Sequence, residues 1–214
     1  MRKRLSDIRT DFIKGGLERK DLAPDPLTQI HRWVKQAVSA RVDEPTAMLL
    51  STVDQQGVPD ARVVLLKGIE EGLVFYTNYG SAKGEQLALN ANVSVVFFWP
   101  QLERQIRLRG VAEKLLSSAS DAYFASRPRE SQLGAWASPQ STCIESYEWL
   151  EKNYLFHADR FQQTEVIPRP SYWGGYRVMP WSVEFWQGRP GRMHQRYRYT
   201  RNEAEVWQID VLAP

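Results

Sequence analysis

The spacing of apolar residues changes from a helical to an extended repeat near position 45. After the pair Asp25-Pro26, which is typical of a helix start, apolar residues recur every three or four positions: Leu27, Ile30, Trp33, Val34, Ala37 and Val38. This spacing predicts an amphipathic helix over residues 26–40. Further helices are predicted over residues 81–89, 118–125, 130–137 and 144–161.

Short runs rich in β-branched and aromatic residues, bounded by turn residues, predict strands in the rest of the chain. The predicted strands cover residues 47–53, 61–67, 73–77, 93–99, 105–115, 173–179, 182–187, 192–200 and 206–212. The connections at residues 54–57 and 71–72 are short, so their neighbouring strands are expected to be antiparallel. The pattern indicates a mainly β (α+β) fold and favours a closed or split antiparallel barrel over a parallel sheet. We expect an N-terminal arm over residues 1–24 and one domain over residues 25–214.

The composition of the chain excludes several classes of protein. One cysteine, Cys143, excludes an internal disulfide, and three scattered histidines give no zinc-ligand spacing, so no metal is expected. The first twelve residues lack the apolar run of a signal peptide, and no long apolar stretch occurs, so a cytoplasmic protein without a membrane partner is expected. The net charge is +3, but the basic residues form no stripe, which argues against a nucleic-acid partner.

Basic residues stand at the ends of several predicted elements. Arg62 and Lys67 close an apolar run, and in one extended strand they would project from opposite faces. Lys83 lies in the first turn of the helix that begins at Ser81, where free backbone N–H groups suit a phosphate. An ordinary core strand and a solvated lysine beside a serine cap are the alternative readings. Further cations follow at Arg127, Arg129, Arg192 and Arg196.

Alternation over residues 192–196 would place Arg192, His194 and Arg196 on one strand face, where they repel one another unless an anion or an electron-rich ligand binds there. No Gly-x-Gly-x-x-Gly, Walker loop or Ser-His-Asp spacing occurs. The residues therefore predict a pocket for phosphorylated ligands, in which a bound cofactor carries the difficult chemistry.

Several runs along the chain together carry a family resemblance. They are Arg62-Val63-Val64-Leu65-Leu66-Lys67, Phe75-Tyr76-Thr77-Asn78, Leu102-Glu103-Arg104-Gln105, residues 126–136, Trp173-Gly174-Gly175, Glu184-Phe185-Trp186-Gln187-Gly188, Arg192-Met193-His194-Gln195-Arg196 and Leu212-Ala213-Pro214. In this order they resemble pyridoxine/pyridoxamine 5'-phosphate oxidase. The resemblance implies a homodimeric split-barrel flavoprotein with FMN at the subunit interface. Such an enzyme oxidises pyridoxine 5'-phosphate or pyridoxamine 5'-phosphate to pyridoxal 5'-phosphate with oxygen, and it releases hydrogen peroxide, plus ammonia from the amine.

The resemblance also assigns residues. As FMN contacts it implies Arg62, Val63, Val64, Leu65, Leu66, Lys67, Tyr76, Thr77, Lys83, Gln105, Gln140, Ser141, Trp186 and Arg196, with Arg62 and Lys83 at the FMN phosphate. As substrate contacts it implies Arg9, Phe12, Lys67, Tyr123, Arg127, Ser131, Arg192, Met193 and His194. Lys67, Tyr123, Arg127 and Ser131 would bind the substrate phosphate, and Arg192 and His194 would be the catalytic pair beside the substrate ring.

Three positions depart from the family pattern. Ala82 stands where arginine is frequent, Phe12 where tyrosine is frequent, and Met193 where leucine is usual. The first removes one potential contact to the FMN phosphate, and the second removes a hydroxyl from the segment expected to close over the substrate.

Two alternative functions remain: an FMN oxidase of the phenazine-biosynthesis type, and a non-catalytic split-barrel protein that binds flavin, haem or pyridoxal phosphate. The retained Tyr123, Arg127 and Ser131 argue against the first alternative, and Arg192 with His194 argues against the second.

Overall fold

The computed structural model describes residues 4–5, 11–202 and 204–214. The chain forms two compact units. The first comprises the described parts of Met1–Leu50, Ser94–Gly110 and Pro180–Pro214, and the second comprises Ser51–Val93 and Val111–Met179. Within the described ranges, no helix has the length and apolar character that crossing a membrane requires.

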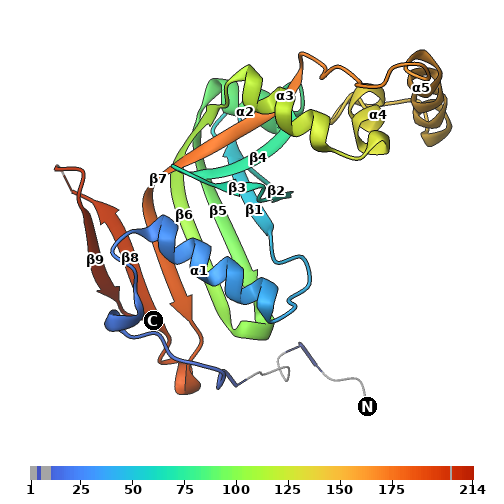
Figure 1. Ribbon diagram of the computed structural model, residues 1–214. Helices are drawn as coiled ribbons and strands as arrows, with labels where there is room; N and C mark the ends of the chain where they lie inside the picture. Colours follow the sequence, from blue (N-terminus) through green and yellow to red (C-terminus); the bar gives the residue numbers. More distant parts are fainter. Residues whose placement is uncertain (1–3, 6–10, 203) are drawn as a thin grey trace. The chain divides into compact units, whose positions relative to one another are not determined.

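The described strands belong to one sheet with the order β2-β1-β5-β6-β7-β4-β3, while β8 pairs with β7 and β9 pairs with β8 (Figure 1). Their bounds are β1 (Ala47–Val53), β2 (Pro59–Leu65), β3 (Gly68–Ile69), β4 (Leu73–Asn78), β5 (Asn92–Trp99), β6 (Arg104–Lys114), β7 (Trp173–Gln187), β8 (Gln195–Arg201) and β9 (Trp207–Leu212). The helices are α1 (Pro26–Ser39), α2 (Ala82–Leu89), α3 (Ser117–Ser126), α4 (Arg129–Ala137) and α5 (Tyr147–Arg160). The β3–β4, β4–β7, β7–β8 and β8–β9 ladders are antiparallel, in agreement with the predicted antiparallel fold.

In the first unit, α1 begins where the sequence predicts. The Asp25 side chain accepts a hydrogen bond of 2.7 Å from the backbone N–H of Thr28, and proline follows at the first helical position. Ile30, Trp33 and Ala37 of the apolar stripe are buried, whereas Val38 at its end is exposed. The Trp33 ring packs edge-on against Phe185 of β7, with ring centres 5.1 Å apart. The predicted helix is therefore confirmed, and its buried face forms part of the core of this unit.

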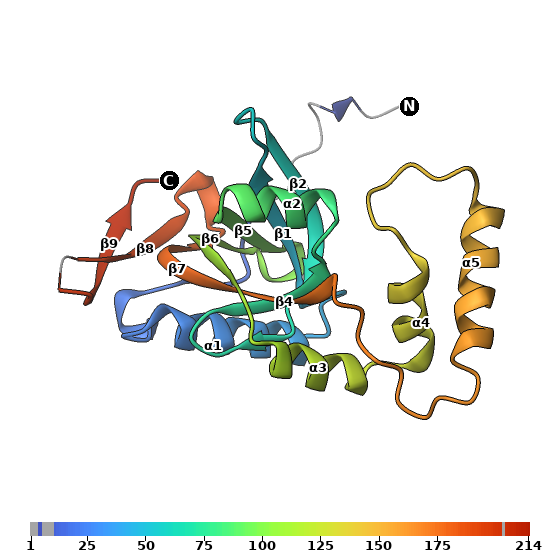
Figure 2. The same cartoon turned by 90° about the horizontal axis from the view of Figure 1, so that it is seen from above.

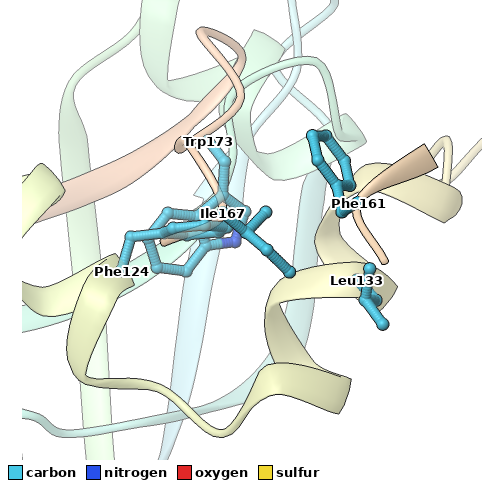
Figure 3. Packing of buried hydrophobic residues seen from close by; sticks show 5 residues of the cluster. All are labelled: Phe124, Leu133, Phe161, Ile167 and Trp173. Carbon is cyan, nitrogen blue, oxygen red and sulfur yellow. The ribbon is translucent and has the colours of Figure 1, made fainter. Parts of the chain in front are cut away.

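One hydrophobic core cluster of the second unit lies between its helices and the start of β7. Figure 3 shows its buried side chains gathered there: Phe124, Leu133, Phe161, Ile167 and Trp173. Helices α4 and α5 lie side by side in both views of the chain (Figures 1 and 2). This packing fixes the segment that joins α3 to α4.

The register of β4 on β7 explains the Trp-Gly-Gly run. Gly175 lies opposite Tyr76, and a Cβ atom at position 175 would stand 2.8 Å from the Tyr76 ring and 2.5 Å from Leu115. At Gly174 an added Cβ would stand 2.1 Å from the Tyr79 hydroxyl. Any side chain at position 174 or 175 would collide with these neighbours, so glycine is required for the Tyr76 ring to pack against β7.

Two predicted strand limits are wrong. The predicted strands 173–179 and 182–187 are one strand, β7, because Pro180 lies between the part paired with β4 and the part paired with β8, so its missing N–H interrupts neither ladder. The predicted strand 192–200 begins only at Gln195. Arg192 ends a 3-10 turn, Pro190–Arg192, in which Gly191 and Arg192 have φ angles of 62° and 61°. Positive φ ends the extended conformation, so Arg192, His194 and Arg196 do not share a strand face.

A third prediction fails for a similar reason. Strand β2 ends at Leu65, and Lys67 lies beyond it, where its backbone N–H bonds to Val74 at 2.8 Å. The alternation rule therefore does not relate Arg62 to Lys67, and both residues line the same cavity.

Candidate functional site

A cavity of about 960 Å³ in the second unit gathers most of the residues that the sequence points to. It is lined by β2, β4, the start of α2, the α3–α4 junction, the loop after α4 and the start of β7. Among its lining residues are Arg62, Val63, Val64, Leu65, Lys67, Tyr76, Thr77, Lys83, Tyr123, Arg127, Ser131, Gln140 and Ser141. Leu66 is buried and is not part of this lining.

Lys83 is a buried cation at the start of a helix. The Ser81 side chain caps α2 by accepting from the backbone N–H of Gly84 at 3.3 Å, which places Lys83 in the first turn. The Lys83 ammonium, with a residue exposure of 8%, donates to Gln140 Oε1 at 3.0 Å and to Thr77 Oγ1 at 3.3 Å. Burial lowers the pKa of Lys83 below its ordinary value of 10.5, and the positive charge of Arg62 lowers it further. An anion bound here would offset both effects.

Gln140 ties the loop after α4 to this cation. Its Oε1 atom also accepts from Thr77 Oγ1 at 3.1 Å, so one carbonyl oxygen joins β4, α2 and this loop. The next residue, Ser141, has a φ of 71°, a left-handed conformation that is uncommon for serine. Three predicted FMN contacts, Thr77, Lys83 and Gln140, are thus joined by hydrogen bonds, and Ser141 lines the same cavity.

Arg127 packs against aromatic rings instead of polar side chains. Its guanidinium lies 4.6 Å from the centre of the Trp173 ring, and the rings of Tyr76 and Tyr123 stack at 3.8 Å beside that tryptophan. The Nη1 atom of Arg127 is buried and has no hydrogen-bond partner among the described residues. Burial lowers the pKa of Arg127, while Tyr123 opposes that shift. A buried cationic donor without a partner is costly, which indicates an anionic ligand at this point.

Tyr123, Arg127 and Ser131 recur every fourth residue across the α3–α4 junction, and all three line the cavity. Lys67 also lines it and is exposed. The four predicted substrate-phosphate residues therefore belong to one cavity. This cavity also holds the Lys83 and Arg62 cations, so it offers two cationic groups to its ligands.

The remaining predicted residues belong to the first unit: Phe12, Gln105, Trp186, Arg192, Met193, His194 and Arg196. The His194 ring lies 4.7 Å from Trp186 and 5.3 Å from Phe12. Its Nδ1 atom accepts a hydrogen bond of 3.1 Å from the backbone N–H of Arg189, so the neutral ring carries its proton on Nε2. Arg9 lies outside the described residues.

Arg196 is held by a carboxylate that the sequence reading did not select. Its Nε atom donates to Glu184 at 2.9 Å, and its Nη1 atom donates to the Ala213 carbonyl at 2.8 Å. Glu184 is buried on β7, two residues before Trp186. The sequence did offer a signal for Glu184, because an acidic residue between Val183 and Phe185 is unusual in an apolar strand. Thr52 and Gln86, which bond to Arg62, left no such signal.

Comparison with known proteins gives matches over nearly the whole chain. A family model described as pyridoxamine 5'-phosphate oxidase matches residues 34–155, and one described as the pyridoxine 5'-phosphate oxidase C-terminal dimerisation region matches residues 173–214. A pyridoxine/pyridoxamine 5'-phosphate oxidase of Burkholderia thailandensis is 49% identical over 213 residues, covering 98% of this chain and 99% of the relative. One from Vibrio campbellii is 50% identical over 211 residues, with the same coverage.

Two solved structures resemble the chain as well. PhzG from Burkholderia lata 383, in complex with tetrahydrophenazine-1-carboxylic acid, has a TM-score of 0.86 at 31% identity, and the match covers 91% of this chain and 95% of that one. A pyridoxamine 5'-phosphate oxidase-related FMN-binding protein from Nostoc punctiforme has a TM-score of 0.70 at 18% identity, covering 90% and 100%. The second similarity establishes the fold alone, and the predicted split-barrel class is confirmed.

Proposed function

This chain belongs to the pyridoxine/pyridoxamine 5'-phosphate oxidase family, and from that premise we propose that it oxidises both phosphates to pyridoxal 5'-phosphate with FMN bound in the second-unit cavity. Oxygen accepts the two electrons and becomes hydrogen peroxide. Oxidation of pyridoxamine 5'-phosphate also consumes water and releases ammonia. The observation that carries the proposal is the presence of two cationic seats in one cavity, one at Lys83 with Arg62 and one at Arg127.

The residues present fit a flavin phosphate at the first seat. Lys83 is buried beside a second cation, and the capped start of α2 adds backbone N–H groups and the positive end of the helix. Such a site is stabilised by a bound dianion. The flavin, when bound, supplies the hydride acceptor. By resemblance, the further contacts are Val63, Val64, Leu65, Leu66, Lys67, Tyr76, Thr77, Gln105, Gln140, Ser141, Trp186 and Arg196.

The second seat fits the phosphate of the substrate. Arg127 offers a buried donor that has no partner among the described residues, and Lys67, Tyr123 and Ser131 add one cation and two hydroxyls. Two cations and two hydroxyls suit a tetrahedral dianion. Binding the phosphate here orients the substrate, because the reacting carbon lies at a fixed distance from that group.

The catalytic pair is assigned by resemblance to Arg192 and His194, with Met193 between them and with Arg9 and Phe12 in the segment expected to cover the substrate. We propose that Arg192 holds the substrate ring and stabilises charge that develops as hydride leaves. His194, with its proton on Nε2, can donate a hydrogen bond to a ring substituent. The separate role of each residue, and the closing of residues 1–24 over the substrate, stay predictions.

We further propose a homodimer with FMN at its interface. The C-terminal match is to a dimerisation region, and the apolar side chains of Val63 and Leu65 on the cavity wall are 64% and 39% exposed. A second copy would cover such side chains. Light scattering is expected to give about twice the chain mass of 24.8 kDa at every accessible concentration. An active monomer saturated with FMN would contradict this proposal.

The similarity to PhzG supports an alternative function, that of a phenazine-type oxidase. An anaerobic spectrum of the FMN-loaded protein separates the two functions. Pyridoxine 5'-phosphate is expected to bleach the flavin absorbance, and unphosphorylated pyridoxine is expected to do so poorly, because the Arg127 seat then lacks its anion. Equal bleaching by both compounds, or none by either, would refute the proposed substrate.

A further inference from the structure

We propose that Thr52 and Gln86 are positioning residues that hold the Arg62 guanidinium ready for the flavin phosphate. The inference rests on the proposed function, since it gives Arg62 a phosphate to bind. It goes beyond the family resemblance, which assigns no role to either residue. Both belong to the second unit, as Arg62 does.

The three side chains form a closed triangle of hydrogen bonds. Arg62 Nη1 donates to Thr52 Oγ1 at 2.5 Å, and Arg62 Nη2 donates to Gln86 Oε1 at 3.3 Å. The Thr52 hydroxyl, having accepted from the arginine, donates its own proton to Gln86 Oε1. Thr52 is fully buried, with 0% exposure, so this hydroxyl has a fixed position on β1. The triangle therefore fixes both terminal nitrogens of the arginine.

The two partners in this triangle, Thr52 and Gln86, are neutral side chains. Thr52 and Gln86 orient the guanidinium without cancelling its charge. Asp60 also pairs with Arg62 Nη2 and lines the cavity. The Asp60 side chain is 50% exposed and the Arg62 side chain 19% exposed, so solvent screens this ion pair in part. A buried carboxylate in place of Thr52 would neutralise Arg62, and the neutral hydroxyl avoids that outcome.

Helix α2 connects the two cations of this seat. Lys83 and Gln86 are three residues apart on α2 and so lie on neighbouring positions of one helix face. Lys83 bonds to Thr77 and Gln140, and Gln86 bonds to Thr52 and Arg62. One rigid element thus sets both cations before the ligand arrives. Binding then orders fewer side chains, which favours affinity.

The test compares two flavins on the full-length protein: FMN, and riboflavin, which lacks the phosphate. Thr52→Val keeps the shape of the side chain and removes the hydroxyl. We expect this variant to bind FMN about three- to tenfold more weakly, as quenching of flavin fluorescence measures, and to bind riboflavin as wild type does. Thr52→Ser keeps the hydroxyl and should restore FMN affinity. Thr200→Val on β8, outside the cavity lining, is the matched control and should change neither affinity.

The same measurement in an Arg62→Ala background shows whether Thr52 acts through the arginine. We expect Thr52→Val to have no further effect there, because the group it positions is gone. Equal losses in both backgrounds, or equal losses for FMN and riboflavin, would show a general packing effect and overturn the inference. Gln86→Met provides a second variant with the same expected pattern if Thr52→Val folds poorly.

The outcomes also separate this inference from the proposed function. If Arg62→Ala weakens FMN binding and Thr52→Val does not, the positioning role is refuted while the flavin site stands. If Arg62→Ala itself leaves FMN affinity unchanged, Arg62 does not bind the phosphate, and both the inference and that part of the proposed function are refuted.

Discussion

Replacing Arg127 by alanine tests the substrate-phosphate seat most directly. Among the described residues Arg127 forms no ion pair and its buried Nη1 atom has no hydrogen-bond partner, so the substitution breaks no such pair. It removes the stacking of the partly buried guanidinium on Trp173, which is worth roughly 1–2 kcal/mol, and it also removes the cost of burying a cation. The two effects oppose each other, so the melting temperature is expected to change little.

The loss should instead appear in binding of the substrate. A hydrogen bond between a guanidinium and a phosphate contributes about 1.5–3 kcal/mol, which corresponds to a rise in KM of about 10- to 150-fold for pyridoxine 5'-phosphate. The phosphate is remote from the reacting carbon, and the bond is present in both the ground state and the transition state. The variant should therefore keep a kcat near that of wild type.

Steady-state kinetics with pyridoxine 5'-phosphate, together with the flavin content of the purified variant, measures this effect. Arg129→Ala is the matched control: Arg129 is in the same sequence run, but it donates to the carbonyls of Phe161 and Thr164 and is not part of the cavity lining. The control should keep the wild-type KM. An Arg127→Ala enzyme with unaltered kcat/KM, or one that loses its FMN, would refute the assignment of Arg127 to the substrate phosphate.

Three further predictions concern other parts of the chain. Lys83→Ala should weaken FMN binding by about ten- to a hundredfold in a fluorescence titration, and unchanged affinity would remove Lys83 from the site. Arg192→Ala should lower kcat with a smaller change in KM, as single-turnover flavin reduction would report, and a pure KM effect would contradict its place at the substrate ring. Burial raises the pKa of Tyr176 and of Tyr199 from 10.0 to about 12, so the folded state resists ionisation of these groups. The free energy of unfolding is expected to be unaffected by them below pH 10 and to fall as the pH rises toward 12. In urea unfolding, Tyr176→Phe should leave the free energy of unfolding unchanged, because that hydroxyl lacks a partner among the described residues. Tyr199→Phe should lower it by about 1 kcal/mol, because the Tyr199 hydroxyl loses its 2.7 Å hydrogen bond to the Ala23 carbonyl. Equal effects of the two substitutions would refute this prediction.

Local patterns determined the elements whose causes are local. The Asp25 cap and the apolar stripe that contains Trp33 predicted α1 within one residue of its observed end, since capping and helical periodicity involve only neighbouring residues. The Ser81 cap likewise predicted the start of α2 and the place of Lys83 in its first turn. The family resemblance, and no local pattern, assigned Tyr123, Arg127 and Ser131 to the substrate phosphate, and the structure places all three in the lining of one cavity.

Tertiary structure decided what depends on partners distant in sequence. The hydrogen bonds of Lys83 to Gln140, and of Arg62 to Thr52 and Gln86, join residues up to 57 positions apart, and no local pattern specifies such contacts. The Trp173 ring lies beneath the Arg127 guanidinium for the same reason.

The failed predictions have this origin as well. The alternation rule assumes a continuous strand, and a strand ends where its ladder ends: at Leu65 for β2, and only from Gln195 onward for β8. The sequence determined which residue types are available for two phosphates. Arg62 and Lys67, five residues apart, line one cavity because the backbone leaves the sheet after Leu65, and only the tertiary structure shows this.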